Sequence, residues 1–318
     1  MRILVMGAGA LGSVAGGFMA KAGHTVHFVG RAPHVTAIDG RRLRIAGIWG
    51  DHCVKGIVPH TDAAQVTGEA FDLILVTVKS YDTPDAVEAI RPLVGDDTLV
   101  CAYQNGLGNA ETIAEAFGWA RTVGARAIYG ARITAPGDVA VTVIANPTAL
   151  GVYSPDAPAE RVREIVRAMD AAGLPTVFTD DIRGVLWAKV AYNAALNPLS
   201  ALLDVHYGAL PASSYGRAIM DDVIEELYAV AEAMGVQLDP NTPGAYRTLF
   251  YEKLVPPTAA HYASMREDFL QHRRTEIDAL NGAIARYGEV HGVDCPTNRM
   301  LTRLVHAREC AYGVAEPG

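Results

Sequence analysis

Short apolar runs alternate with amphipathic stretches through the first half of the chain. The stretch from Gly9 to Ala22 and TPDAVEAIRPL at 83–93 have the periodicity of helices. Runs such as LILVTV lack the polar alternation of a half-exposed strand, which is typical of strands buried on both faces. This order predicts a parallel sheet with helices on both faces. The runs that we expect to form its strands are RILVMG at 2–7, TVHFVG at 25–30, FDLILVTVK at 71–79 and TLVCAY at 98–103.

The pattern changes between about 121 and 153. Pro136-Gly137 and Asn146-Pro147 are turn signals between short β-prone runs, so we expect antiparallel strands that extend the sheet. A helix over 160–173 and a short strand, PTVFT, complete this first domain.

Beyond Asp180-Asp181 the apolar positions recur every three or four residues, and no further strand is predicted. Several of these segments end in Gly or Asn, which are common residues at the C-terminal end of a helix, so we expect them to be helices. At 318 residues the chain is long enough for two cores. The sequence therefore predicts an α/β fold with a doubly wound N-terminal domain over 1–179 and an all-helical domain over 180–318.

The hexamer GAGALG follows the first strand and opens the first helix. In a G-x-G-x-x-G turn, Gly7 permits the tight turn, Gly9 lets the backbone approach a pyrophosphate, and Gly12 lets the helix pack on the strand. A glycine-rich packing turn or an export signal over 3–20 are the alternatives, but the strand that follows favours a dinucleotide site. The candidate cofactor-binding residues of the turn are Gly7, Ala8, Gly9, Ala10, Leu11 and Gly12.

The end of the second strand indicates which dinucleotide binds. An acid there would bond a ribose 2′-hydroxyl, but the chain has Gly30-Arg31, and a guanidinium suits the 2′-phosphate of NADP(H). A solvated surface arginine is the alternative reading. Lys79 and Asn105 also follow strands at the edge where open sheets bind ligands, so both are cofactor candidates. The alternatives are a surface lysine at 79 and a simple Asn-Gly turn at 105.

Lys189, Asn193 and Asn197 lie four residues apart within an apolar stretch, so a helix would present them on one face. Buried polar groups need partners, and a polar cleft would supply them. Pro198 is expected to end or kink this helix. Glu276 is expected on the apolar border of a later helix. There it is a helix-terminal charge, a partner of Arg273 or Arg274, or a functional carboxylate.

Composition narrows the function classes. The net charge of −8 and the lack of a Lys/Arg-rich run argue against nucleic acid as a partner. The four cysteines lie far apart, so neither a disulfide framework nor a metal site is expected, and a reducing cytoplasm fits best. We expect neither a metal nor a membrane partner, and a homodimer is left open.

Five motifs, taken together, resemble the ketopantoate reductases (2-dehydropantoate 2-reductases) over nearly the whole chain. The combination of K-x-x-x-N-x-x-x-N-P-L with T-E-I-D-x-x-N-G some eighty residues later is far rarer than the glycine motif alone. The motifs are GAGALG, QNGLG at 104–108, LWAKVAYNAALNPLSA at 186–201, Ser264-Met265 and RRTEIDALNG at 273–282.

The resemblance implies a Rossmann-type domain followed by a helical domain like the C-terminal one of 6-phosphogluconate dehydrogenase. It implies that Lys189 protonates the keto oxygen while NADPH delivers hydride to C2, and that Glu276 holds a substrate hydroxyl. An ammonium in that place would also stabilise the developing alkoxide. Asn193, Asn197 and Ser264 would bind substrate, and Asn105 would lie between nicotinamide and substrate.

Two segments depart from the family pattern. The family commonly has N-G-E-L after the N-P-L segment, with an asparagine that reaches the substrate, but this chain has Tyr207-Gly208-Ala209-Leu210. Before Ser264, where the family often ends a polar run with S-S-M, it has His261-Tyr262-Ala263. The expected activity is NADPH-dependent reduction of ketopantoate. The alternatives are reduction of another branched or aromatic 2-oxo acid and, in another class, a non-catalytic NADP-binding sensor.

Overall fold

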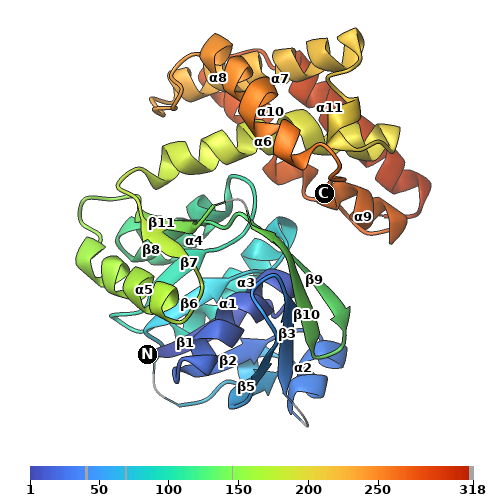
Figure 1. Cartoon of the computed structure of the whole chain (residues 1–318). Helices are drawn as coiled ribbons and strands as arrows, with labels where there is room; N and C mark the ends of the chain where they lie inside the picture. The colour runs from blue at the N-terminus through green and yellow to red at the C-terminus, as the bar shows by residue number, and fades with distance from the viewer. Residues whose placement is uncertain (40–41, 69, 145, 315–318) are drawn as a thin grey trace. The chain divides into compact units, whose positions relative to one another are not determined.

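The computed structural model describes residues 1–39, 42–68, 70–144 and 146–314. The chain forms two compact units, Met1–Ile182 and Arg183–Gly318 (Figure 1). The division falls in the first turn of a long helix, α6 (Ile182–Leu203).

An eight-stranded sheet forms the centre of the first unit. Its order is β12-β11-β8-β7-β6-β1-β2-β5, and its strands pair in parallel except β8 with β11. The strands are β1 (Arg2–Met6), β2 (Thr25–Val29), β5 (Ile57–His60), β6 (Leu73–Val76), β7 (Leu99–Ala102), β8 (Thr122–Arg126), β11 (Thr148–Val152) and β12 (Thr176–Phe178). The helices of this unit are α1 (Ala10–Lys21), α2 (Ala32–Asp39), α3 (Thr83–Ile90), α4 (Asn109–Phe117) and α5 (Ala159–Ala171).

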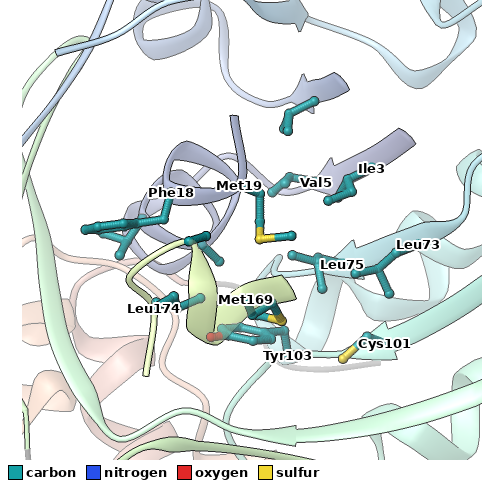
Figure 2. Packing of buried hydrophobic residues seen from close by; sticks show 14 of the residues in the cluster. Ile3, Val5, Phe18, Met19, Leu73, Leu75, Cys101, Tyr103, Met169 and Leu174 are labelled. Atoms are coloured by element: carbon teal, nitrogen blue, oxygen red, sulfur yellow. The ribbon is translucent and has the colours of Figure 1, made fainter. Parts of the chain in front are cut away.

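Side chains from both faces of this sheet are buried, as the unbroken apolar runs predict. On β1, Ile3 and Val5 belong to the core beneath α1 and α5, which also contains Met19 and Met169 (Figure 2). Leu4 points the other way, into a core that α3 and α4 cover. Successive residues of a strand face opposite sides, so helices on both faces are needed to cover such a run.

The predicted antiparallel extension is confirmed for β8 and β11 but is wrong for the hairpin between them. Strands β9 (Tyr129–Ala135) and β10 (Asp138–Ile144) leave the main sheet and form a second, four-stranded sheet of order β4-β3-β10-β9. Its other strands are β3 (Leu43–Gly47) and β4 (His52–Val54), which the sequence patterns do not predict. The hairpin pairs with a segment about ninety residues earlier, and local periodicity carries no information on such a pairing.

The second unit contains helices and no strand within residues 183–314, as predicted. Beyond α6, its helices are α7 (Ser214–Ala233), α8 (Pro243–Leu249), α9 (Ser264–Leu270), α10 (Asn281–His291) and α11 (Pro296–Ala311). Short turns of 3₁₀ or π type connect them at Tyr207–Ala209, Phe250–Leu254, Pro256–Thr258 and Ile277–Ala279.

Candidate functional site

The glycine turn joins β1 to α1 and is tied to the next strand. The N–H groups of Gly7 and Ala8 both donate to the carbonyl of Val29, at 3.0 and 2.8 Å. The Thr77 hydroxyl donates to the Gly7 carbonyl at 2.7 Å. Gly9 precedes α1 and offers no side-chain cap. The first N–H groups of the helix, with its positive dipole end, are therefore available to an anion.

The three glycines of the motif have different surroundings. A Cβ at Gly7 would lie 2.5 Å from the Val78 nitrogen, and Gly7 has a φ of +106°. A Cβ at Gly12 would lie 2.5 Å from the Thr77 hydroxyl oxygen and 2.6 Å from the Gly7 carbonyl oxygen. At Gly9 the nearest atom is 3.9 Å away, so this side of the turn is open. This is the arrangement that lets a pyrophosphate approach the backbone at Gly9.

These surroundings predict opposite effects for two substitutions. Gly12→Ala should lower the free energy of unfolding by about 1–3 kcal/mol, because backbone must shift to admit the methyl group. Gly9→Ala should leave stability within about 0.5 kcal/mol but raise the Kd for NADPH by at least about tenfold. Urea unfolding and NADPH fluorescence titration measure the two effects. An unchanged Kd in Gly9→Ala would show that the cofactor binds elsewhere.

The other predicted cofactor residues lie after strands next to β1 in the sheet. Arg31 is exposed and follows β2. Lys79 follows β6 and precedes a 3₁₀ turn at Ser80–Asp82, and Asn105 follows β7. Because these strands are parallel, the structure brings all three residues to the edge of the sheet where the glycine turn lies.

A buried network behind Asn105 is not predicted from the sequence. Gln104 Nε2 donates to the Thr83 hydroxyl at 2.6 Å, and this hydroxyl donates to Asn109 Oδ1 at 2.9 Å. Asn109 Nδ2 then donates to the Asn105 carbonyl at 2.9 Å. The network fixes the main chain of Asn105. The sequence signal is weak, since Asn109 reads only as a polar residue at the start of a helix.

Pro198 lies inside α6, which continues to Leu203, so of the two expected effects, an end or a kink, the end of the helix is wrong. Proline has no N–H and cannot bond the carbonyl four residues earlier, that of Ala194. Asn281 Nδ2, at the start of α10, donates to this carbonyl at 3.1 Å and to Asn298 Oδ1 at 3.0 Å. Because Pro198 leaves the Ala194 carbonyl without its helical partner, this carbonyl can accept the bond that attaches α10 to the part of α6 bearing Asn193 and Asn197.

Glu276 does not lie on a helix, which corrects the sequence prediction. It precedes the 3₁₀ turn Ile277–Ala279, and α10 begins only at Asn281. The Thr275 N–H donates to the buried Glu309 carboxylate at 2.6 Å, and its hydroxyl accepts the Ile277 N–H at 3.3 Å. Glu276 is therefore held between two anchored residues, Thr275 and Asn281. The apolar spacing that suggested a helix reflects burial of Ile277 and its neighbours in a tighter turn.

His306 supports the same segment. Its ring contacts Asp278 Oδ1 at 2.8 Å and Glu309 Oε2 at 2.9 Å. Burial alone would lower the pKa of His306, but the hydrogen bonds to Glu309 and Asp278 outweigh it and raise the pKa. The imidazole, bonded to a carboxylate through each ring nitrogen, fastens α11 to the turn that follows Glu276.

The remaining predicted substrate residues also lie in the second unit. Asn193 is half-buried on α6, and Ser264 is exposed at the first position of α9. Asn197 is buried, and its Oδ1 accepts a hydrogen bond from the Tyr207 hydroxyl at 2.6 Å. The predicted roles of these residues and of Lys189 stay predictions. Lys189, Asn193 and Asn197 do share one helix, as their spacing predicts.

The described residues contain neither a metal-binding cluster nor a membrane-spanning helix. No group of three His, Cys, Asp or Glu side chains there is placed to hold a metal ion. Over the same residues, no helix has the length and apolar character needed to cross a membrane.

Known families match both parts of the chain. The family described as Ketopantoate reductase PanE/ApbA matches residues 3–155, and that described as Ketopantoate reductase PanE/ApbA C terminal matches residues 181–309. The 2-dehydropantoate 2-reductase of Aquifex aeolicus (strain VF5) is 37% identical over 311 residues, 97% of this chain and 97% of that protein. The chain belongs to the ketopantoate reductase family. The resemblance inferred from the five motifs is thereby confirmed.

Two solved structures that are similar to this chain are named as different enzymes. A PanE/ApbA family ketopantoate reductase from Ralstonia eutropha JMP134 has 33% identity and a TM-score of 0.87, covering 99% of this chain and 100% of that one. D-mandelate dehydrogenase, with NADH and anilino(oxo)acetate, has 28% identity and a TM-score of 0.87, again covering 99% and 100%. The predicted fold class, a Rossmann-type sheet followed by a helical region, is confirmed.

Proposed function

We propose that this ketopantoate reductase family member reduces 2-dehydropantoate to (R)-pantoate, with NADPH supplying the hydride to C2 and Lys189 the proton to the keto oxygen. The reaction belongs to pantothenate biosynthesis, which leads to coenzyme A. One observation carries the proposal. The hydrogen bond from Asn281 to the Ala194 carbonyl attaches the segment after Glu276 to the part of α6 that carries Asn193 and Asn197. In the proposed site, the Glu276 carboxylate and the amide groups of Asn193 and Asn197 would bind the same substrate.

The proposed roles divide between residues 1–179, which bind NADP(H), and residues 180–318, which bind and protonate the substrate. Asn193, Asn197 and Ser264 would hold the 2-oxo acid, and Glu276 would accept a hydrogen bond from its hydroxyl. The Lys189 ammonium would also stabilise negative charge that develops on the oxygen. Asn105, held through Asn109, would contact nicotinamide and substrate.

Support for NADP(H) comes from the turn and from Arg31. Gly9 leaves open space for a pyrophosphate, and no acid follows β2 to repel a 2′-phosphate. Arg31 is exposed and offers a forked donor to that phosphate, with Lys79 as a second cation at the same sheet edge. Cytoplasmic localisation is supported by the four cysteines, which are all described and all free thiols.

The substrate assignment is tested by a panel of 2-oxo acids followed through NADPH absorbance. We expect 2-dehydropantoate to give a higher kcat/KM than a branched acid without the hydroxyl group or phenylglyoxylate, because Glu276 recognises that hydroxyl. The matched control is each assay repeated with NADH, which should give lower kcat/KM throughout. A panel in which 2-dehydropantoate is the poorest substrate would reject this assignment.

A second candidate is reduction of an aromatic 2-oxo acid. The similarity to D-mandelate dehydrogenase and the loss of the family asparagine at position 207, which would reach the substrate, favour it. In the same panel, phenylglyoxylate would then give the highest kcat/KM. A non-catalytic NADP-binding sensor would instead bind NADPH tightly and reduce none of the acids. The presence of both Lys189 and Glu276 argues for turnover.

A further inference from the structure

Tyr207 and Asn197 form a buried hydrogen-bonded pair in the second unit. Asn197 is 6% exposed and Tyr207 is 4% exposed. The tyrosine hydroxyl donates to Asn197 Oδ1 at 2.6 Å. Tyr207 occupies the segment where the family pattern has an asparagine that reaches the substrate, so the side chain found here contacts a predicted substrate ligand instead.

Tyr207 is itself rigidly held by the second segment that departs from the family pattern. Its N–H donates to the His261 carbonyl at 2.9 Å, and the Gly208 N–H donates to the Ala259 carbonyl at 2.8 Å. A Cβ at Gly208 would lie 2.9 Å from the Ala259 Cβ, so the two segments are in close contact. The Tyr207 ring packs against those of Tyr192 and His261, with centroids 6.1 and 5.4 Å apart. The two departures from the family are therefore one structural feature.

The hydrogen bond determines which end of the Asn197 carboxamide is available. A carboxamide has an acceptor oxygen and a donor N–H₂ group, and the oxygen is engaged by Tyr207. Within the described part of the chain, this is the side chain's one hydrogen bond to protein. Burial, with Tyr192 nearby, raises the pKa of Tyr207, so its hydroxyl stays protonated and remains a donor.

We propose that Tyr207 is a positioning residue for substrate binding, which holds Asn197 so that its N–H₂ group donates to the carboxylate of the 2-oxo acid. A carboxylate offers only acceptors, so it requires a donor at this position. The inference rests on the proposed function, because it takes Asn197 as a substrate ligand. It also means that Asn197 recognises the carboxylate, which all 2-oxo acids share, and does not distinguish their side chains.

The test is Tyr207→Phe, which keeps the ring packing and removes only the hydroxyl. The KM for the 2-oxo acid should rise by about tenfold, by a similar factor for each acid in the panel, while kcat and the KM for NADPH change far less. Tyr228→Phe is the matched control, since Tyr228 is buried in the same unit and its hydroxyl donates to the Pro240 carbonyl at 2.7 Å. Tyr228→Phe should lose about as much stability as Tyr207→Phe, with no change in the KM for the 2-oxo acid.

A double-mutant cycle separates positioning from a general structural effect. In an Asn197→Ala background, Tyr207→Phe should raise KM no further, because the group that it orients is gone. Asn197→Asp keeps the acceptor for Tyr207 but places a carboxylate against that of the substrate, so its KM should rise more than that of Tyr207→Phe. If Asn197→Ala does not fold, Asn197→Asp still tests whether the KM depends on the donor group of Asn197.

Three results would overturn the inference: an unchanged KM in Tyr207→Phe, an effect on one acid of the panel alone, or full additivity in the cycle. In each case the wild-type enzyme still turns over, so the proposed function survives. A wild-type protein that reduces none of the acids would instead reject the proposed function, and this inference with it.

Discussion

Replacing Lys189 with alanine should lower kcat by about 10²–10⁴-fold while leaving the Kd for NADPH nearly unchanged. The proposed ammonium donates the proton that the keto oxygen receives and stabilises the charge that develops on it. Both contributions are larger in the transition state than in the ground state, so kcat should fall more than KM rises. Steady-state kinetics with 2-dehydropantoate and a fluorescence titration with NADPH measure the two quantities.

Lys253→Ala is the matched control for this experiment, because it removes an exposed lysine from the same unit. Its kcat should equal that of the wild type. A near-wild-type kcat in Lys189→Ala would contradict the assignment of Lys189 as proton donor, whatever the KM. Intact NADPH binding in the same variant shows that the protein is folded.

Asn281→Ala should lower the free energy of unfolding by about 2–4 kcal/mol, because it leaves two buried acceptors without their partner. These are the Ala194 carbonyl, which Pro198 cannot satisfy, and Asn298 Oδ1. The segment that carries Glu276 also loses its attachment to α6, so kcat/KM should fall as well. Urea unfolding followed by circular dichroism measures the stability.

Pro198→Ala tests the reason for this loss. Alanine at 198 supplies the N–H that the Ala194 carbonyl otherwise receives from Asn281, so it should stabilise Asn281→Ala more than it stabilises the wild type. Equal effects of Pro198→Ala in both backgrounds would show that the carbonyl is not what links the two helices. The kcat/KM of the double variant should stay low, because the restored helical bond does not reattach α10.

Local patterns were sufficient for the features that depend on neighbours in sequence. The glycine spacing from Gly7 to Gly12 specifies the turn, because neighbouring atoms leave no room for a Cβ at Gly7 or Gly12, while Gly9 keeps one side of the turn open. The unbroken run over β6 requires burial on both faces, which leaves few alternatives to a doubly wound sheet. The spacing of Lys189, Asn193 and Asn197 places them on one helix.

The parts that failed or were missed depend on contacts between distant segments. Glu276 has the apolar spacing of a helix, but the Thr275 N–H is bonded to Glu309 and the chain turns before α10 begins. The β9–β10 hairpin has the signals of an extending pair but joins another sheet. In both cases long-range partners outweigh a local preference, which is individually weak.

By itself the sequence determined the glycine turn, the strands and helices next to it, and the residue types available for catalysis, because these follow from steric and hydrophobic rules over a few residues. Only the tertiary structure decided that Asn281 bonds the carbonyl that Pro198 frees, and that Tyr207 bonds Asn197. A hydrogen bond requires its two atoms to lie within about 3 Å, and that distance is set by how whole helices pack.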